Sequence, residues 1–181
     1  MKPMQPLHDL TFRQRVALVG NAASIFAKAD GKAIDAHDVV IRMNMGLPNL
    51  WAHKVESLGT RTDVWATAKH FGIPPRECKL TVFMKLTELG NRDWQSISKL
   101  YPTLPMIRWP HELEVECRQF VGADPGTGIR LLWYLKTHGK PASVSTFGMD
   151  CWESTSHWSG KKNTPNHMPD LEKAAMQRLL E

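Results

Sequence analysis

Short apolar runs alternate along the chain with more polar, helix-forming segments. The runs are rich in Val, Ile, Leu or Phe and are flanked by Gly, Pro or polar residues; they lie at Val16–Val19, Val39–Met43, Asp63–Ala66, Leu80–Leu86, Met106–Trp109 and Val144–Phe147. Runs of this length are typical of buried strands. Helices are expected between and after them, over Ala22–Ala29, Arg92–Leu100, Thr127–Thr137 and Pro169–Glu181. This alternation predicts an α/β fold, a single doubly wound Rossmann-like sheet with helices on both faces.

One segment follows a different period. Glu112–Glu116 alternates charged and apolar side chains, which predicts a strand with one solvated and one buried face. The same arrangement argues against a carboxylate pair for glycoside hydrolysis.

The composition predicts one globular domain over residues 1–181. A chain of 181 residues with 42% hydrophobic residues is long enough to bury one core. No stretch approaches the roughly 20 apolar residues that a membrane-spanning helix needs. The three cysteines, Cys78, Cys117 and Cys151, are an odd number without close spacing. They favour free thiols and a reducing, cytoplasmic compartment over a disulfide framework.

The formal net charge of +5 suits an anionic partner, which on charge alone is a small molecule, nucleic acid or an acidic membrane face. Nucleic-acid-binding proteins usually present a clustered basic stripe. Here the basic residues are scattered, and the loop Cys151–Asn166 contains one tight pair, Lys161-Lys162. The pattern therefore does not favour nucleic acid.

Glycine and asparagine residues stand where the predicted strands end. Gly20-Asn21 follows the first strand, Asn44 follows the second, and Asp124–Gly128 opens a predicted helix. In doubly wound sheets, ligands bind beyond the carboxyl ends of the strands, where helix N-termini present unpaired N–H groups to anions. Each feature alone is typical of an ordinary turn, and Arg42 is expected to be a structural ion-pair partner. The absence of a P-loop pattern argues against a nucleoside triphosphatase.

Taken in order, these segments resemble the animal-type sialyltransferases, glycosyltransferase family 29. Val19-Gly20-Asn21 and Ile34–Asn44, which reads Ile-Asp-Ala-His-Asp-Val-Val-Ile-Arg-Met-Asn, resemble the large sialyl motif of that family. Gly59–Asp63 resembles the segment that follows this motif. Pro125–Gly128, with Phe147-Gly148 about twenty residues later, resembles the small sialyl motif.

The two remaining motifs of the family also have counterparts. His157-Trp158 resembles the short aromatic histidine motif, and His167 with Glu172 fits the terminal His-x-x-x-x-Glu pattern. The resemblance thus extends over most of the chain. It implies the GT-A-like variant of the Rossmann-like fold that sialyltransferases have.

The resemblance implies an enzyme that moves sialic acid from its cytidine monophosphate (CMP) conjugate to a glycan hydroxyl, with inversion at the anomeric carbon. His167 is implied as the general base and His157 as the partner of the departing phosphate, tasks that suit a histidine near neutral pH. Trp152 and Trp158 are expected to contact donor or acceptor from the Cys151–Asn166 loop. The implied donor-binding residues are Asn21, Asn44, Gly20, Thr127, Gly128 and Gly148.

Neither a cofactor nor a metal ion is expected. The Asp-x-Asp element that holds the cation in most metal-dependent nucleotide-sugar transferases does not occur in the chain. Cys151, His157 and His167 are spaced by six and ten residues, which is not the spacing of a zinc finger. The expected partners are a CMP-sugar donor and a glycan or glycolipid acceptor, with peripheral contact to a membrane.

The donor sugar and the catalytic competence stay open. The ulosonic acid Kdo (3-deoxy-manno-octulosonic acid) is also activated by CMP and shares the carboxylate beside the anomeric carbon. A degenerate module that binds the CMP-sugar without chemistry is the alternative, because Ala22 and Gly126 replace residues that are often hydroxylic in relatives. The two cysteines that the family bridges correspond to Val16 and about Gly139, so the resemblance here implies a compact cytosolic relative, of bacterial or viral type.

Thiol titration tests the absence of that bridge. Because neither family position holds a cysteine in this chain, we expect active protein to show three reactive thiols after denaturation. Alkylation without reductant followed by mass spectrometry gives the number. Two missing thiols that reductant restores would contradict the reducing compartment.

Overall fold

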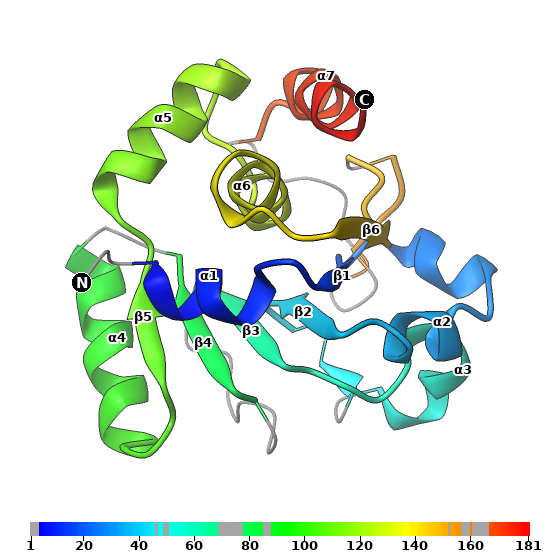
Figure 1. Ribbon diagram of the computed structural model, residues 1–181, viewed down its shortest axis with the longest axis horizontal. Helices are drawn as coiled ribbons and strands as arrows, with labels where there is room; N and C mark the ends of the chain where they lie inside the picture. The colour runs from blue at the N-terminus through cyan, green and yellow to red at the C-terminus, as the bar shows by residue number, and fades with distance from the viewer. Residues whose placement is uncertain are drawn as a thin grey trace.

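The computed structural model describes residues 4–45, 47–48, 51–68, 78–84, 88–151, 153–156, 160 and 167–181, and for residues 88–93 the backbone alone. Its centre is one six-stranded sheet in the order β5-β4-β3-β2-β1-β6 (Figure 1). Every neighbouring pair is parallel. The strands are β1 (Arg15–Val19), β2 (Val39–Met43), β3 (Val64–Thr67), β4 (Leu80–Phe83), β5 (Met106–Arg108) and β6 (Ser143–Phe147).

The described helices are longer near the C-terminus than near the N-terminus. The α-helices are α1 (Gln5–Thr11), α2 (Gly31–Asp35), α3 (Val55–Leu58), α4 (Glu88–Leu100), α5 (His111–Val121), α6 (Thr127–Tyr134) and α7 (Pro169–Leu180). The 3-10 helices η1 (Ala23–Ala27) and η3 (Ala52–Lys54) and the π-helical turn η4 (Leu135–Gly139) complete the set. Each predicted strand is present, although the last two residues of the run Leu80–Leu86 lie outside the described residues. The predicted helix Ala22–Ala29 is the 3-10 helix η1.

Alternate residues of the central strands pack on opposite faces of the sheet. Val16 and Leu18 of β1 belong to the large core that the sheet shares with α1, α5, α6 and α7. Ala17 and Val19 belong to a smaller core with Ile34 of α2. Figure 1 shows α5, α6 and α7 on one face and α2 and α3 on the other, so the prediction of helices on both faces is confirmed.

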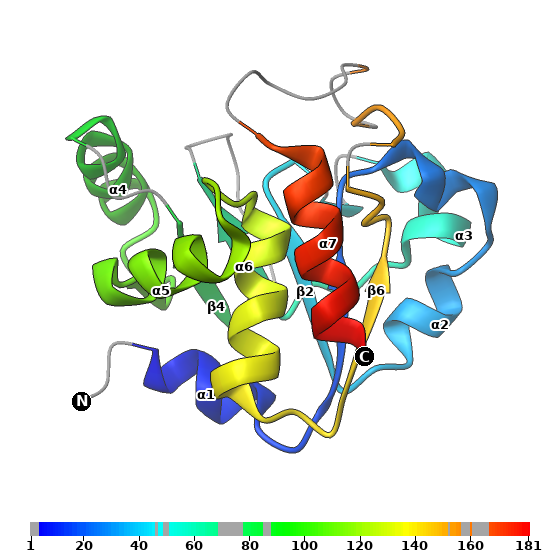
Figure 2. The same cartoon turned by 90° about the horizontal axis from the view of Figure 1, so that it is seen from above.

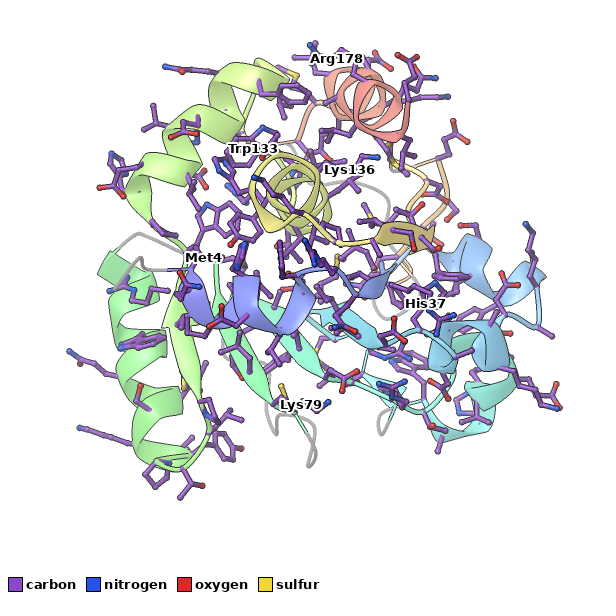
Figure 3. All side chains as sticks on the ribbon, viewed as in Figure 1. Met4, His37, Lys79, Trp133, Lys136 and Arg178 are labelled. Carbon is purple, nitrogen blue, oxygen red and sulfur yellow. The ribbon has the colours of Figure 1, made fainter. Side chains whose placement is uncertain are left out.

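Side chains mark these two faces as well. Met4 and Trp133 belong to the large core, and Arg178 of α7 lies beyond it (Figure 3). Lys79, which pairs with Asp63 at 2.8 Å, lies on the opposite side of the sheet. Because the large core lies between the sheet and α1, α5, α6 and α7, most of the stabilisation from apolar burial comes from this layer.

The prediction of a strand over Glu112–Glu116 is wrong, because this segment lies in α5. The helix follows Pro110 and ends at Gly122, whose φ of +83° fits the left-handed position after a helix. Glu114 is buried and receives hydrogen bonds from Arg118 and Arg130. A buried, paired glutamate replaces the solvated strand position that the period-2 pattern suggested.

Residues of the large sialyl motif hold together the loops that lead into β2 and β3. The Asp35 carboxylate accepts the N–H groups of Thr60 and Arg61 at 2.7–3.0 Å. The Arg61 guanidinium donates to the carbonyl oxygens of Asp35, His37 and Asp38. These contacts lie at the amino-terminal edge of the sheet, where β2 and β3 begin, so the charged residues of the motif serve the fold there.

Arg42 has a structural role, and among the described residues its guanidinium binds carbonyl oxygens, where the sequence had suggested an ion pair. Its side chain is fully buried on the face of the smaller core, where Nε donates to the Arg61 carbonyl at 2.7 Å and Nη2 donates to the Leu58 carbonyl. Burial lowers the pKa of Arg42 to about 10. One buried cation therefore holds the loop between α3 and β3 by its carbonyl oxygens.

Replacing this arginine tests its structural role. Arg42→Met keeps much of the volume but leaves two carbonyl oxygens without their donor, so the free energy of unfolding should fall by about 2–3 kcal/mol. Arg15→Met is the control, because Arg15 is about half exposed in its pair with Asp38, and its loss should destabilise the protein much less than the loss of Arg42. Urea denaturation measures both, and equal losses would contradict the assignment.

Candidate functional site

The ends of β1 and β6 meet at the point where the order of strands reverses. The chain leaves β1 towards β2 on one side, and β6 returns to pair with β1 on the other. Gly20 donates its N–H to the Phe147 carbonyl at 2.7 Å, and Ala22 donates to the Gly148 carbonyl at 3.0 Å. Such a reversal is where open α/β sheets place their ligands.

Glycine is required at both strand ends. A Cβ on Gly20 would lie 2.2 Å from the Gly148 carbonyl oxygen, a distance that no side chain tolerates. Gly148 has a φ of +58°, in the left-handed region that favours glycine. The two glycines thus let the two backbones approach each other where β1 and β6 end.

Asn21 carries an unsatisfied polar atom at this edge. Its Oδ1 is buried and has no hydrogen-bond partner among the residues that the structure describes. Ser156, whose backbone forms an antiparallel bridge with Ala22, has a buried Oγ that also has no hydrogen-bond partner among the described residues. Buried atoms without a partner among the described residues also occur elsewhere, Thr62 Oγ1 and Thr81 Oγ1 among them, so these two atoms add polar groups to the predicted site without identifying a ligand. No pattern in the sequence pointed to Ser156.

Asn44 forms the turn at the end of β2. Its φ is +48°, a left-handed conformation that asparagine tolerates better than most residues. Its N–H donates to the Ala66 carbonyl at 2.8 Å, and its Oδ1 accepts the N–H of Ala68 at 3.1 Å. Asn44 therefore holds the ends of β2 and β3 together, whatever else its amide does.

The first turn of α6 lies over the ends of the strands. A Cβ on Gly128 would lie 3.0 Å from Met149 Cε and 3.4 Å from Met43 Sδ, so glycine lets the helix approach the ends of β2 and β6. The first N–H groups of any α-helix have no acceptor within the helix, and the helix dipole makes this end attractive to anions. Thr127 and Gly128 contribute these groups here.

His167 lies beside this turn and contacts Glu172. Its Nδ1 is 3.1 Å from Glu172 Oε1, and the same oxygen accepts the N–H of Gly126 at 2.8 Å. The Glu172 side chain is only 3% exposed, whereas that of His167 is 21% exposed. A Cβ on Gly126 would lie 3.6 Å from His167 Cε1. Gly126, which stands where relatives often have a hydroxylic residue, is therefore a close neighbour of the histidine ring.

The two helices that carry these groups begin at the same edge. Figure 2 shows α6 and α7 side by side, with their first turns at the edge where β6 ends. The structure thus brings together the predicted Gly20, Asn21, Thr127, Gly128, Gly148 and His167 around the carboxyl edge of the sheet. His157, Trp152 and Trp158 lie outside the described residues, so their roles stay predictions.

The three cysteines are buried or partly buried thiols. All three cysteines are free, and burial raises the pKa of Cys117 to about 12 and that of Cys151 to about 11. Within the described ranges, His, Cys, Asp and Glu side chains form no group of three or more that could hold a metal ion. Nor is any described helix long and apolar enough to cross a membrane.

The hydrogen bond between His167 and Glu172 predicts a tautomer. A carboxylate only accepts hydrogen bonds, so neutral His167 should carry its proton on Nδ1 and leave the lone pair on Nε2. Nitrogen-15 NMR of the imidazole distinguishes the two tautomers. In Glu172→Ala this preference should weaken, whereas an Nε2–H tautomer in the wild-type protein would contradict the contact.

Comparison with solved structures agrees with the fold. A crystal structure of a mammalian sialyltransferase superimposes with a TM-score of 0.69 at 20% sequence identity, covering 92% of this chain and 65% of that one. The same comparison with a mammalian sialyltransferase in complex with Gal-beta-1-3GalNAc-ortho-nitrophenol gives a TM-score of 0.66 at 18% identity, with the same coverage. The chain therefore spans slightly less than two thirds of the length of these proteins.

Sequence comparison points to the same group of proteins. No curated protein matches the chain. Residues 2–90, which include β1, β2 and the large sialyl motif, match the family model of glycosyltransferase family 29 (sialyltransferase). The chain is therefore similar in sequence to glycosyltransferase family 29 over residues 2–90, just under half of its length, and similar in fold to solved sialyltransferases.

Proposed function

We propose that the protein transfers sialic acid, or a related ulosonic acid such as Kdo, from its CMP conjugate to a hydroxyl of a glycan or glycolipid. The observation that carries this proposal is the contact of His167 with Glu172 beside the first turn of α6. This contact places a candidate general base beside a helix N-terminus that can bind an anion. Both lie where the order of strands in the sheet reverses. The family match supports a CMP-sugar as the donor.

The nucleotide would occupy the carboxyl edge of β1, β2 and β6. The unsatisfied Oδ1 of Asn21 offers an acceptor for a hydrogen-bond donor of the nucleotide. Thr127 and Gly128 offer N–H groups at the positive end of α6 to the phosphate. Gly20 and Gly148 keep side chains out of the space where β1 and β6 end. Asn44 would add a contact from the turn that it already forms.

His167 would act as the general base. When the acceptor hydroxyl attacks the anomeric carbon, Nε2 would take its proton, and the Nδ1 contact with Glu172 would orient the ring and stabilise the imidazolium that forms. The CMP oxygen leaves with the electron pair of the broken glycosidic bond, so attack from the opposite side gives inversion. We assign His157 to the departing phosphate on its motif alone.

We further propose that neither a metal ion nor a cofactor takes part. The charge that develops on the departing phosphate can be met by the N-terminus of α6 and by His157. The sequence has no Asp-x-Asp element to hold a cation. The three free cysteines and the net charge of +5 support a cytoplasmic protein that meets glycolipid acceptors at an anionic membrane face.

A donor-binding module without catalysis is the second candidate. Gly126 replaces a residue that is often hydroxylic in relatives, so the turn offers one hydrogen-bonding group fewer. The N–H of Gly126, however, donates to Glu172, the carboxylate that also contacts His167. Retention of this contact favours the enzyme.

Product analysis tests the proposal. We expect protein incubated with CMP-sialic acid or CMP-Kdo, a panel of galactosides and a chelator to give a glycosylated product by mass spectrometry. His167→Ala should lower kcat roughly 10²–10⁴-fold and leave CMP affinity nearly unchanged, because a general base acts mainly in the transition state.

His138→Ala is the matched control, because His138 is a partly exposed histidine of η4, on the helix end away from the site. Its turnover should equal that of the wild-type protein. CMP binding without any product would favour the non-catalytic module, and near wild-type turnover in His167→Ala would contradict the choice of base.

A further inference from the structure

Four charged side chains form a closed set of contacts behind the first turn of α6. Arg118 Nε donates to Glu114 Oε1 at 2.8 Å, and Arg118 Nη2 donates to Asp124 Oδ1 at 2.9 Å. Arg130 reaches the same two carboxylates, with Nη2 2.7 Å from Glu114 Oε1 and 2.8 Å from Asp124 Oδ1. We call Glu114, Arg118, Asp124 and Arg130 the charge ring.

The charge ring joins three consecutive parts of the chain. Glu114 and Arg118 come from α5, Asp124 from the turn, and Arg130 from α6. The side chains of Glu114 and Arg130 are only 8% and 13% exposed. Burial works to raise the pKa of Glu114, but the two guanidinium groups outweigh it and lower that pKa. The ring is thus a partly buried network of strong, charge-assisted hydrogen bonds, unlike an exposed ion pair.

The turn between the ring and the helix is held from two sides. On the side of α5, Asp124 receives Arg118 and Arg130. On the side of α7, the N–H of Gly126 donates to Glu172. Pro125 lies between these two points and fixes its own φ. The direction in which Thr127 and Gly128 present their N–H groups therefore depends on both contacts.

We propose that the charge ring positions the turn that binds the donor phosphate, and that Asp124 and Arg118 are positioning residues of this glycosyltransferase. The inference rests on the proposed function. Two positive and two negative groups give the ring no net charge, so its formal charges nearly cancel at the phosphate. Its contribution is geometric: it sets where the N–H groups of the first turn of α6 point.

Substitutions that change the net charge in opposite directions distinguish a geometric effect of the ring from an electrostatic one. Asp124→Asn removes one negative charge, which by charge alone should strengthen binding of an anion. Arg118→Gln removes one positive charge, which by charge alone should weaken it. If the ring acts by positioning, both variants should weaken CMP binding, by roughly 5- to 10-fold. Both side chains are about half exposed, so we expect both variants to fold.

The pair Arg15–Asp38 offers matched controls. These residues form an equally close contact, 2.9 Å between Arg15 Nη2 and Asp38 Oδ1, at the edge where β1 and β2 begin. Asp38→Asn and Arg15→Gln make the same changes in charge and break the same kind of pair. Calorimetry should show less than about a twofold change in CMP affinity for both controls.

Hydrogen exchange measures how strongly the charge ring restrains the turn, and it needs no ligand. We expect Asp124→Asn and Arg118→Gln to speed exchange in residues 122–130, and the two controls to leave this segment unchanged. Unchanged exchange there, or CMP affinity that follows the change in charge, would overturn the inference. Wild-type protein that binds no CMP would contradict the proposed function, and the exchange data would then decide whether the ring holds the turn.

Discussion

One carboxylate joins the two helices of the candidate site. Glu172 accepts the N–H of Gly126 and lies 3.1 Å from Nδ1 of His167, so the first turn of α6 and the segment before α7 share one buried oxygen. In the proposed reaction, the first turn of α6 binds the donor phosphate and His167 takes the proton of the acceptor hydroxyl. Their relative position therefore depends on one shared oxygen as well as on the charge ring, and a fixed position favours a reaction that must align both substrates.

The two edges of the sheet have different chemistry. At the edge where the strands begin, Asp35, Arg61 and the pair Arg15–Asp38 satisfy one another and the backbone. At the edge where β1 ends, Asn21 Oδ1 is buried without a partner among the described residues. The amino-terminal edge also has a buried atom without a described partner, Thr62 Oγ1, so the two edges differ in their charged pairs and in the strand-order reversal that suits a ligand. The large sialyl motif therefore contributes to both edges, with its charges at one and Asn21 at the other.

The sequence predicted the sheet, and it named most of the residues that the structure places at the carboxyl edge. The strands could be found because each is a short apolar run. His167 and Glu172 were connected only by the resemblance to the terminal motif of the family, because a spacing of five residues does not by itself predict a contact. The helix over Glu112–Glu116 could not be predicted from its pattern, because Glu114 is buried by pairing with Arg130, sixteen residues away in sequence. That pairing depends on how α5 and α6 pack, which no local pattern contains. Likewise, nothing local indicated that Arg42 would be buried against carbonyl oxygens.

The central claim is that the carboxyl edge of β1, β2 and β6, together with the first turn of α6, binds CMP. The most direct measurement is a titration of nitrogen-15-labelled protein with CMP in the presence of a chelator, followed by two-dimensional NMR. If CMP binds at this edge, the backbone amides of Gly20, Asn21, Gly128 and Gly148 should show saturable shifts, with little change at Asp35 and Arg61. Shifts that gather at the amino-terminal edge instead, or no saturable shift at all, would contradict it.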